Sequence, residues 1–122
     1  MADKILIVDE VAAMRRSVRS LLGQLGLNNV EESNSGASAL EKLRSSSYDL
    51  IIANHKMESM TGLQLFAKVR ADEKQRGTSF ILMMGVKNPD VIAAAKEAGV
   101  EAFLVKPFKS NDIKSEMNKL GL

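Results

Sequence analysis

Two adjacent carboxylates are the first residues in the chain whose types suggest chemistry. Asp9 and Glu10 follow directly after the apolar run of residues 4–8. Carboxylate oxygens are the ligands that Mg²⁺ prefers in proteins, so such a pair at the end of a strand could hold that cation. The pair alone leaves a second interpretation equally open, in which both residues are solvated loop acids.

Polar residues also follow three further apolar runs. Residues 49–53, 79–84 and 102–105 are short and continuously apolar, a pattern typical of parallel strands buried on both faces. After these runs come, in turn, Asn54, His55, Lys56 and Glu58; Gly85 and Lys87; and Lys106 and Pro107. Sites in open parallel sheets lie outside the carboxyl ends of the strands. We therefore expect two carboxylates, an amide and several lysines to meet on one rim.

Helical patterns separate the strands that must position these residues. The clearest covers residues 12–25, where apolar residues recur on one stripe, while Arg15, Arg16 and Arg19 face away as the polar face of the helix. Further helices are predicted over 37–44, 63–73, from 88–89 to just before Gly99, and over 111–120, with a weaker strand at 29–33. Strands that alternate with helices predict one α/β domain over 1–122, a doubly wound five-stranded parallel sheet of the (βα)5, flavodoxin-like type.

Composition excludes several classes of function. The chain of 122 residues has no cysteine and one histidine, which excludes disulfides, thiol catalysis and multi-histidine metal sites. Lys+Arg total 17 and Asp+Glu 15, and aromatic residues are only 4%, so we expect no nucleic-acid partner. No apolar run approaches the ~18 residues of a membrane span and no signal peptide begins the chain, so we expect a cytoplasmic protein.

Several motifs together resemble the receiver domains of two-component response regulators, and CheY-like receivers in particular. They are residues 5–10 (ILIVDE), 14–22 (MRRSVRSLL), 25–32 (LGLNNVEE), 60–63 (MTGL), 92–95 (IAAA), 105–108 (VKPF) and 118–121 (NKLG). The resemblance implies a signalling domain rather than an enzyme. It implies that Asp9 and Glu10 match an acidic pair that holds Mg²⁺, and that Lys106 matches a lysine that neutralises a phosphoryl group. Pro107 matches a proline preceded by a cis peptide bond, which would aim Lys106 inward.

The chain departs from the receiver pattern where the chemistry should occur. The phosphoacceptor Asp position is Asn54, and an amide cannot form an acyl phosphate. The hydroxyl position after the fourth strand is Gly85, and Lys56 occupies the position whose carbonyl would ligate the metal. We therefore expect a pseudo-receiver with a weak or lost Mg²⁺ site. We hypothesise that Lys56, Lys106 or both replace the metal as counter-charge.

The resemblance also implies an output surface on the fourth helix, fifth strand and fifth helix. Lys87, Phe103 and Lys109 belong to it, and Phe103 stands at a switch position usually occupied by tyrosine. Its excess of lysine favours an acidic protein partner, bound by a receiver that is itself a monomer. Two other interpretations stay open. One is phosphorylation at an unusual residue such as His55 or Ser59, which would keep a phosphotransfer-competent CheY-like regulator with an altered site. The other is small-molecule binding in a flavodoxin-like pocket.

Overall fold

Strands and helices alternate along the whole chain, as the sequence predicts. The structure, a computed structural model, describes residues 3–122. Its elements are β1 (Ile5–Val8), α1 (Ala12–Gln24), β2 (Val30–Ser33), α2 (Gly36–Ser45), β3 (Leu50–Asn54), α3 (Gly62–Ala71), β4 (Ser79–Met84), α4 (Pro89–Ala98), β5 (Ala102–Val105) and α5 (Ser110–Lys119). The predicted α/β fold is thus confirmed, including the weaker strand at β2.

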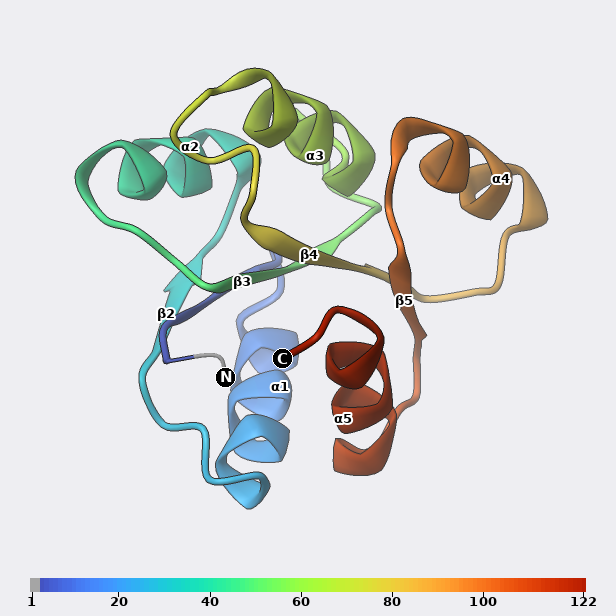
Figure 1. The fold of residues 1–122 in the computed structure, drawn as a ribbon. Helices are drawn as coiled ribbons and strands as arrows, with labels where there is room; N and C mark the ends of the chain where they lie inside the picture. The colour runs from blue at the N-terminus through green and yellow to red at the C-terminus, as the bar shows by residue number, and fades with distance from the viewer. Residues whose placement is uncertain (1–2) are drawn as a thin grey trace.

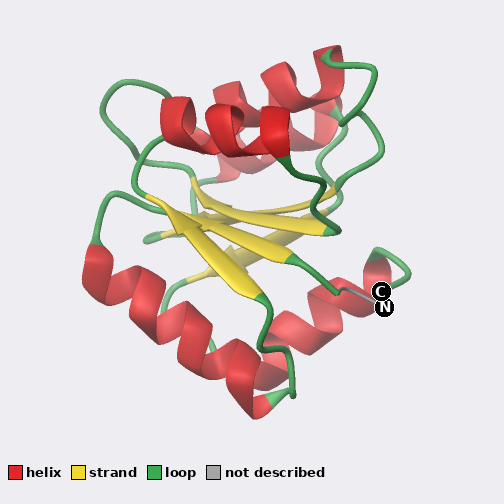
Figure 2. Cartoon of the chain, turned by 90° about the vertical axis from the view of Figure 1, so that its left-hand side faces the viewer, coloured by secondary structure: helices red, strands yellow, loops and turns green. Residues whose placement is uncertain are grey.

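The sheet is parallel throughout, in the strand order β2-β1-β3-β4-β5. β1 and β3 are neighbours, with Val8 opposite Ala53, so the residues that follow these two strands meet at one rim. Figure 1 shows α2, α3 and α4 on one face of the sheet and α1 and α5 on the other. Figure 2 shows the same three layers from the side, with the strands between the two sets of helices.

Each face of the sheet has its own hydrophobic core. On the side of α2, α3 and α4, the rings of Phe66 and Phe80 meet edge to face with their centroids 5.1 Å apart. On the other side, Val18 and Leu22 of α1 and Ile113 of α5 are fully buried against the strands. Apolar residues that alternate along β1 and β3 therefore contribute to both cores, which explains why these strands lack a polar face.

The helix boundaries follow local capping chemistry. The Asn88 side chain accepts the backbone N–H groups of Asp90 and Val91, and Pro89 takes the first helical position of α4, as the sequence predicts. α3 ends at Ala71, two residues before the predicted end. Asp72 has extended backbone and its side chain accepts the N–H of Lys74, so the chain turns there instead of continuing the helix.

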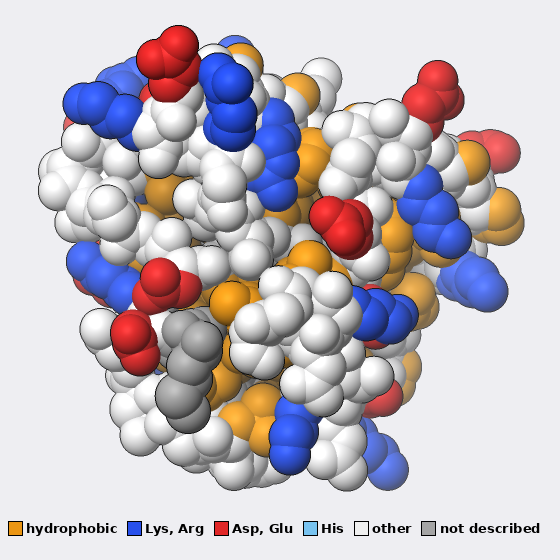
Figure 3. Space-filling view, viewed as in Figure 1, with side chains coloured by type: hydrophobic (Ala, Val, Ile, Leu, Met, Phe, Trp, Pro, Cys, Tyr) orange, Lys and Arg blue, Asp and Glu red, His pale blue; other side chains and the backbone are white. Residues whose placement is uncertain are grey.

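Charges of both signs are interspersed over the face shown in Figure 3, with hydrophobic side chains visible between them. This face carries no continuous basic patch of the kind that nucleic-acid binding uses. Within residues 3–122, none of the helices has the length and apolar character needed to cross a membrane.

Candidate functional site

The rim at the carboxyl ends of β1, β3 and β5 brings together three of the predicted site residues. Asp9 follows β1, Asn54 ends β3 and Lys106 follows β5. The Lys106 ammonium donates to Asn54 Oδ1 at 3.0 Å and lies 3.5 Å from Asp9 Oδ2. Asp9 is 1% exposed, and the neighbouring ammonium of Lys106 is its ion-pair partner. The Lys106–Pro107 peptide bond is cis, as the resemblance implies.

Lys106 also fixes the orientation of the Asn54 amide. An ammonium can only donate hydrogen bonds, so Asn54 must turn its carbonyl oxygen, Oδ1, toward it. Nδ2 then faces the other way and donates to the backbone carbonyl of Lys56 at 3.0 Å. Asn54, which is 7% exposed, therefore has a hydrogen-bond partner from the rim on each end of its amide.

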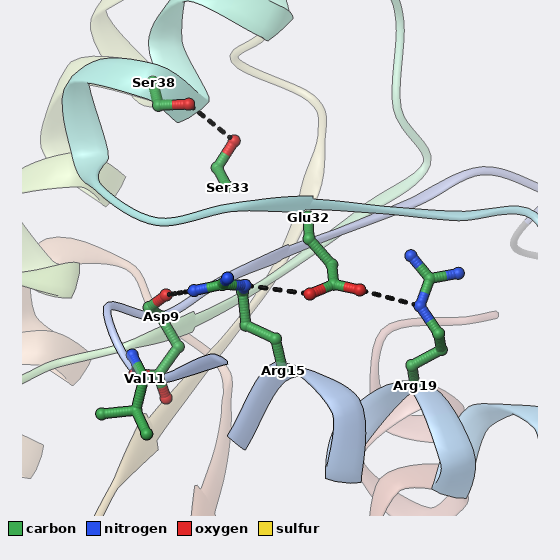
Figure 4. Close-up of polar contacts among 7 residues, drawn as sticks. All are labelled: Asp9, Val11, Arg15, Arg19, Glu32, Ser33 and Ser38. Carbon is green, nitrogen blue, oxygen red and sulfur yellow. Dashed lines mark hydrogen bonds and ion pairs between the residues drawn. The ribbon is translucent and has the colours of Figure 1, made fainter. Parts of the chain in front are cut away.

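Asp9 is held by contacts on both its side chain and its backbone. Its Oδ1 accepts the N–H of Val11 at 3.0 Å, and its backbone carbonyl accepts Nη1 of Arg15 at 2.6 Å. Figure 4 shows that Arg15 and Arg19 of α1 approach the two oxygens of Glu32 on β2, at 2.9 and 2.8 Å. α1, β2 and the Asp9 backbone thus form one connected hydrogen-bond network.

This network gives Arg15 and Arg19 a specific role on the polar face of α1. They lie outside the apolar stripe of α1, as predicted, but both bind the carboxylate of Glu32. Burial raises the pKa of Glu32, and the hydrogen bonds from Arg19 and Arg15 outweigh it, so that the pKa lies below its ordinary value. In the sequence, the sign of this network was the pair of adjacent glutamates, Glu31 and Glu32, in the weak strand at 29–33.

The second carboxylate of the acidic pair has a different environment. Glu10 is exposed, and its Oε2 accepts the backbone N–H of Glu58 at 3.0 Å. Glu10 thereby links the β1–α1 loop to the β3–α3 loop. The two acids of the pair are not equivalent, because Asp9 turns into the rim and Glu10 ties two loops together.

The donor set of this rim does not fit Mg²⁺ well. Both oxygens of Asp9 and one oxygen of Glu10 already face donors of the protein, and the Lys56 carbonyl accepts from the Asn54 amide. An aspartate at position 54 would turn a second oxygen toward the metal, whereas Asn54 turns N–H hydrogens that way. Within residues 3–122, no three His, Asp or Glu side chains are grouped closely enough to hold a metal ion.

The two lysines of the counter-charge hypothesis are placed differently. Lys106 occupies the position between Asp9 and Asn54. The side chain of Lys56 is exposed, and among the ion pairs found in residues 3–122 there is none that involves it. The geometry therefore supports the hypothesis for Lys106, whereas Lys56 contributes to the rim through its backbone carbonyl.

Gly62 positions the end of β3. A Cβ built at Gly62 would lie 2.6 Å from the Asn54 carbonyl oxygen and 2.7 Å from a methyl group of Leu82, so no larger residue fits without a shift. The N–H of Gly62 also donates to the carbonyl of His55 at 2.9 Å. The sequence showed Gly62 only as part of a motif, and close backbone approach is the physical reason for the glycine.

Gly85 has the opposite environment. It is exposed, and a Cβ built there meets nothing within 4 Å. A groove of about 470 Å³ opens beside it, lined by the β3–α3 loop on one side and the β4–α4 loop on the other. His55 lines the same groove and donates its backbone N–H to Met83 at 2.7 Å. Burial lowers the pKa of its imidazole, so the ring is neutral near pH 7.

The predicted output residues lie in three places: Lys87 in the β4–α4 loop next to the groove, Phe103 on β5 and Lys109 just before α5. Phe103 is half-buried on the edge strand β5, and its backbone N–H donates to Glu116 of α5 at 2.8 Å. Lys87 and Lys109 are exposed, and the backbone N–H of Lys109 is bound by Asp112 at the start of α5.

Comparison with known proteins decides the family. The family described as "Response regulator receiver domain" matches residues 5–118. The chain belongs to this family. Among curated receivers, it is 37% identical over 117 residues to "Chemotaxis protein CheY" of Pseudomonas aeruginosa, covering 96% of this chain and 94% of that protein. It is 35% identical to "Chemotaxis protein CheY-3" of Vibrio cholerae, covering 96% and 90%.

Solved receiver structures show the same fold. The chemotaxis protein CheY4 of Vibrio cholerae superposes with a TM-score of 0.88 at 27% identity, covering 98% of this receiver and 99% of that chain. The receiver domain of sensor histidine kinase PA1611 from Pseudomonas aeruginosa superposes with a TM-score of 0.85 at 21% identity, with full coverage of both chains. That structure has a magnesium ion coordinated in its active-site cleft. The protein is thus a CheY-like receiver domain of the two-component signalling class.

Proposed function

We propose that this receiver is a pseudo-receiver, a signalling domain that binds protein partners without being phosphorylated. The observation that carries the proposal is the amide at position 54, where Asn54 accepts from Lys106 and donates to the Lys56 carbonyl. A receiver forms an acyl phosphate when a carboxylate oxygen attacks phosphorus, and the Asn54 amide offers no such nucleophile. Lys106 supplies a fixed positive charge at Asp9, so this buried acid has a counter-charge without a metal ion.

Partner binding is proposed on the face formed by α4, β5 and α5, which the family resemblance favours. Lys87 and Lys109 are exposed on this face, and Phe103 is half-buried within it. Exposed lysines steer an acidic partner toward the face by long-range attraction.

A second candidate is a chemotaxis regulator that takes phosphate at an unusual residue, and the names of the CheY relatives favour it. His55 and Ser59 are the residues for that role. The His55 imidazole is neutral near pH 7, but its Nδ1 is buried without a hydrogen-bond partner in the described chain. Phosphorylation of His55 would therefore have to occur at Nε2.

Mass spectrometry of the intact protein separates these candidates. The wild-type chain and the Asn54→Asp variant are each incubated with acetyl phosphate and Mg²⁺. We expect no phosphoryl adduct on the wild-type chain and an adduct on the variant, because Asp9, Glu10 and Lys106 remain in place. An adduct on the wild-type chain would overturn the proposal. If neither chain gains one, the changes at Lys56 and Gly85 also disable the rim, and the pseudo-receiver stands.

A further inference from the structure

The groove beside Gly85 is a preformed feature rather than a gap between mobile loops. On the β3–α3 side, the backbone N–H of His55 is bound by Met83, and its carbonyl accepts from Gly62. On the β4–α4 side, Asn88 caps α4 through two backbone N–H groups. Both walls are therefore fixed before any ligand arrives, which lowers the entropic cost of binding.

The lining of the groove is largely apolar. Met57 and Met84 are buried behind it and Val91 of α4 is half-buried in it. Methionine side chains adapt their shape to different apolar partners. Val86 at the rim is 80% exposed, and within residues 3–122 Val11 is the other large hydrophobic side chain that is exposed. An apolar side chain left this open gains contact area only when another molecule covers it.

Gly85 lines the groove without contributing a side chain. Since a Cβ at this position meets nothing within 4 Å, a larger residue has open space to occupy there. The residue that stands at the hydroxyl position of the receiver pattern therefore also leaves the groove open at this point.

The charged residues in and beside the groove indicate which residues a bound segment would carry next to its apolar side chain. Lys56 lines the groove and is exposed, and exposed Lys87 stands between Val86 and Asn88, which both line it. Asp90 in the first turn of α4 is the opposing charge on that wall. Exposed Glu58, next to the lining residue Met57, is a second opposing charge beside the groove. Lys56 is nevertheless the Lys or Arg among the lining residues, which include no Asp or Glu, and its ammonium favours an acidic residue in a partner.

We propose that this groove binds a linear segment of a partner protein that carries one large apolar side chain, such as leucine or phenylalanine, flanked by acidic residues. The inference rests on the proposed function, because it places partner binding at the degenerate rim without any phosphoryl group. The groove reaches the amino end of α4, so a bound segment can continue onto the α4–β5–α5 face.

Selection from a phage-displayed random peptide library on the immobilised wild-type protein tests this inference, with counter-selection on the Gly85→Leu variant. We expect the enriched peptides to share one leucine or phenylalanine flanked by Asp or Glu. In fluorescence titrations, Gly85→Leu and Val86→Ser should each weaken a selected peptide by about tenfold, the size expected for one buried apolar side chain. Val11→Ser is the matched control, because Val11 is 54% exposed and lies outside the groove lining.

The outcomes distinguish failure of the inference from failure of the proposed function. Thermal melts first establish that each variant is folded. Selected peptides that lack the apolar and acidic pattern, or that bind Gly85→Leu as tightly as wild type, would overturn the groove as a docking site. The pseudo-receiver would survive that result if the wild-type chain still takes no phosphoryl group. A wild-type adduct together with phosphodonor-dependent peptide binding would instead reject the proposed function.

Discussion

The residues that follow β1 and β5 differ chemically from those that follow β3 and β4, the two strands between them. After β1 and β5, Asp9 and Lys106 face each other as an acid and a cation. After β3 and β4, Asn54 and Gly85 provide an amide and an open space. The difference shows that a receiver rim can keep its shape without its reactive groups. An amide has nearly the outline of a carboxylate, with a donor in place of one acceptor.

The largest expected difference is in the free energy of unfolding, between substitutions of the two glycines Gly62 and Gly85. Gly62→Ala should lower the free energy of unfolding by about 1–3 kcal/mol, because its Cβ would overlap the Asn54 carbonyl and Leu82. Gly85→Ala should leave it unchanged or raise it by up to about 1 kcal/mol, because the site is open and its φ is not positive. Urea denaturation of both variants measures the pair. Equal losses of unfolding free energy in the two variants would contradict the contrast between the crowded Gly62 and the open Gly85.

The second prediction removes the cation of the rim. Lys106→Met should destabilise the fold by about 1–3 kcal/mol, since it leaves the buried Asp9 carboxylate with the Val11 N–H alone. The lower part of that range is expected because the Lys106 side chain is 21% exposed.

Two further variants, one a control and one a rescue, show whether a loss of stability in Lys106→Met comes from the unpaired Asp9. Lys109→Met, at an exposed lysine, should change the free energy of unfolding by less than about 0.5 kcal/mol. Asp9→Asn in the Lys106→Met background should recover most of the loss. A stable Lys106→Met protein in urea denaturation would mean that Asp9 does not need its counter-charge.

The third prediction concerns the hydrogen-bond network of Arg15, Arg19 and Glu32, which includes the backbone carbonyl of Asp9. Arg15→Gln should cost about 1 kcal/mol, since Arg15 serves both Glu32 and the Asp9 carbonyl. Arg19→Gln should cost less, about 0.2–1 kcal/mol, because the polar partner found for Arg19 within residues 3–122 is Glu32 alone and the Arg19 side chain is 44% exposed. A double-mutant cycle with Glu32→Gln measures the coupling. A larger loss for Arg19→Gln would contradict the link to the rim.

The smallest effect is a pH dependence. The folded pKa of Glu32 lies below 4.5, so its contribution to stability is present above that pH and is lost as the pH falls through the folded pKa. Glu32→Gln should therefore differ from wild type at pH 7, by less than about 1 kcal/mol, and converge with it in acid. Glu97→Gln, at an exposed residue of α4, is the control. Denaturation curves from pH 3 to pH 7 measure the difference.

Much of the fold could be predicted from the sequence because the strands are continuous apolar runs. β2 gave the weakest signal, since it is an edge strand whose two glutamates point to opposite networks: Glu31 binds Tyr48 and Lys4, and Glu32 binds the arginines of α1. The end of α3 at Ala71 depends on a local contact, in which the Asp72 side chain accepts the N–H of Lys74, and the prediction from helical periodicity did not weigh that turn signal.

The site could be predicted only as a set of neighbours. The rule that sites follow strand ends located Asp9, Asn54 and Lys106 on one rim, since the strand order makes β1 and β3 adjacent. It could not tell which lysine enters the rim, because that depends on the reach of Lys106 from β5 and on the outward course of Lys56. The ties of Arg15 to Asp9 and of Glu10 to Glu58 join distant segments, and helical periodicity carries no information about them.

The ammonium of Lys106 differs from a metal ion in one respect that reaches beyond the site. A cation attached to the chain cannot be diluted, chelated or exchanged, so its occupancy beside Asp9 does not follow cellular magnesium. Under the proposed function, the rim would present the same surface in every copy of the protein. The strength of the signal would then be set by how many copies the cell makes, and gene expression would be the control that phosphorylation provides elsewhere.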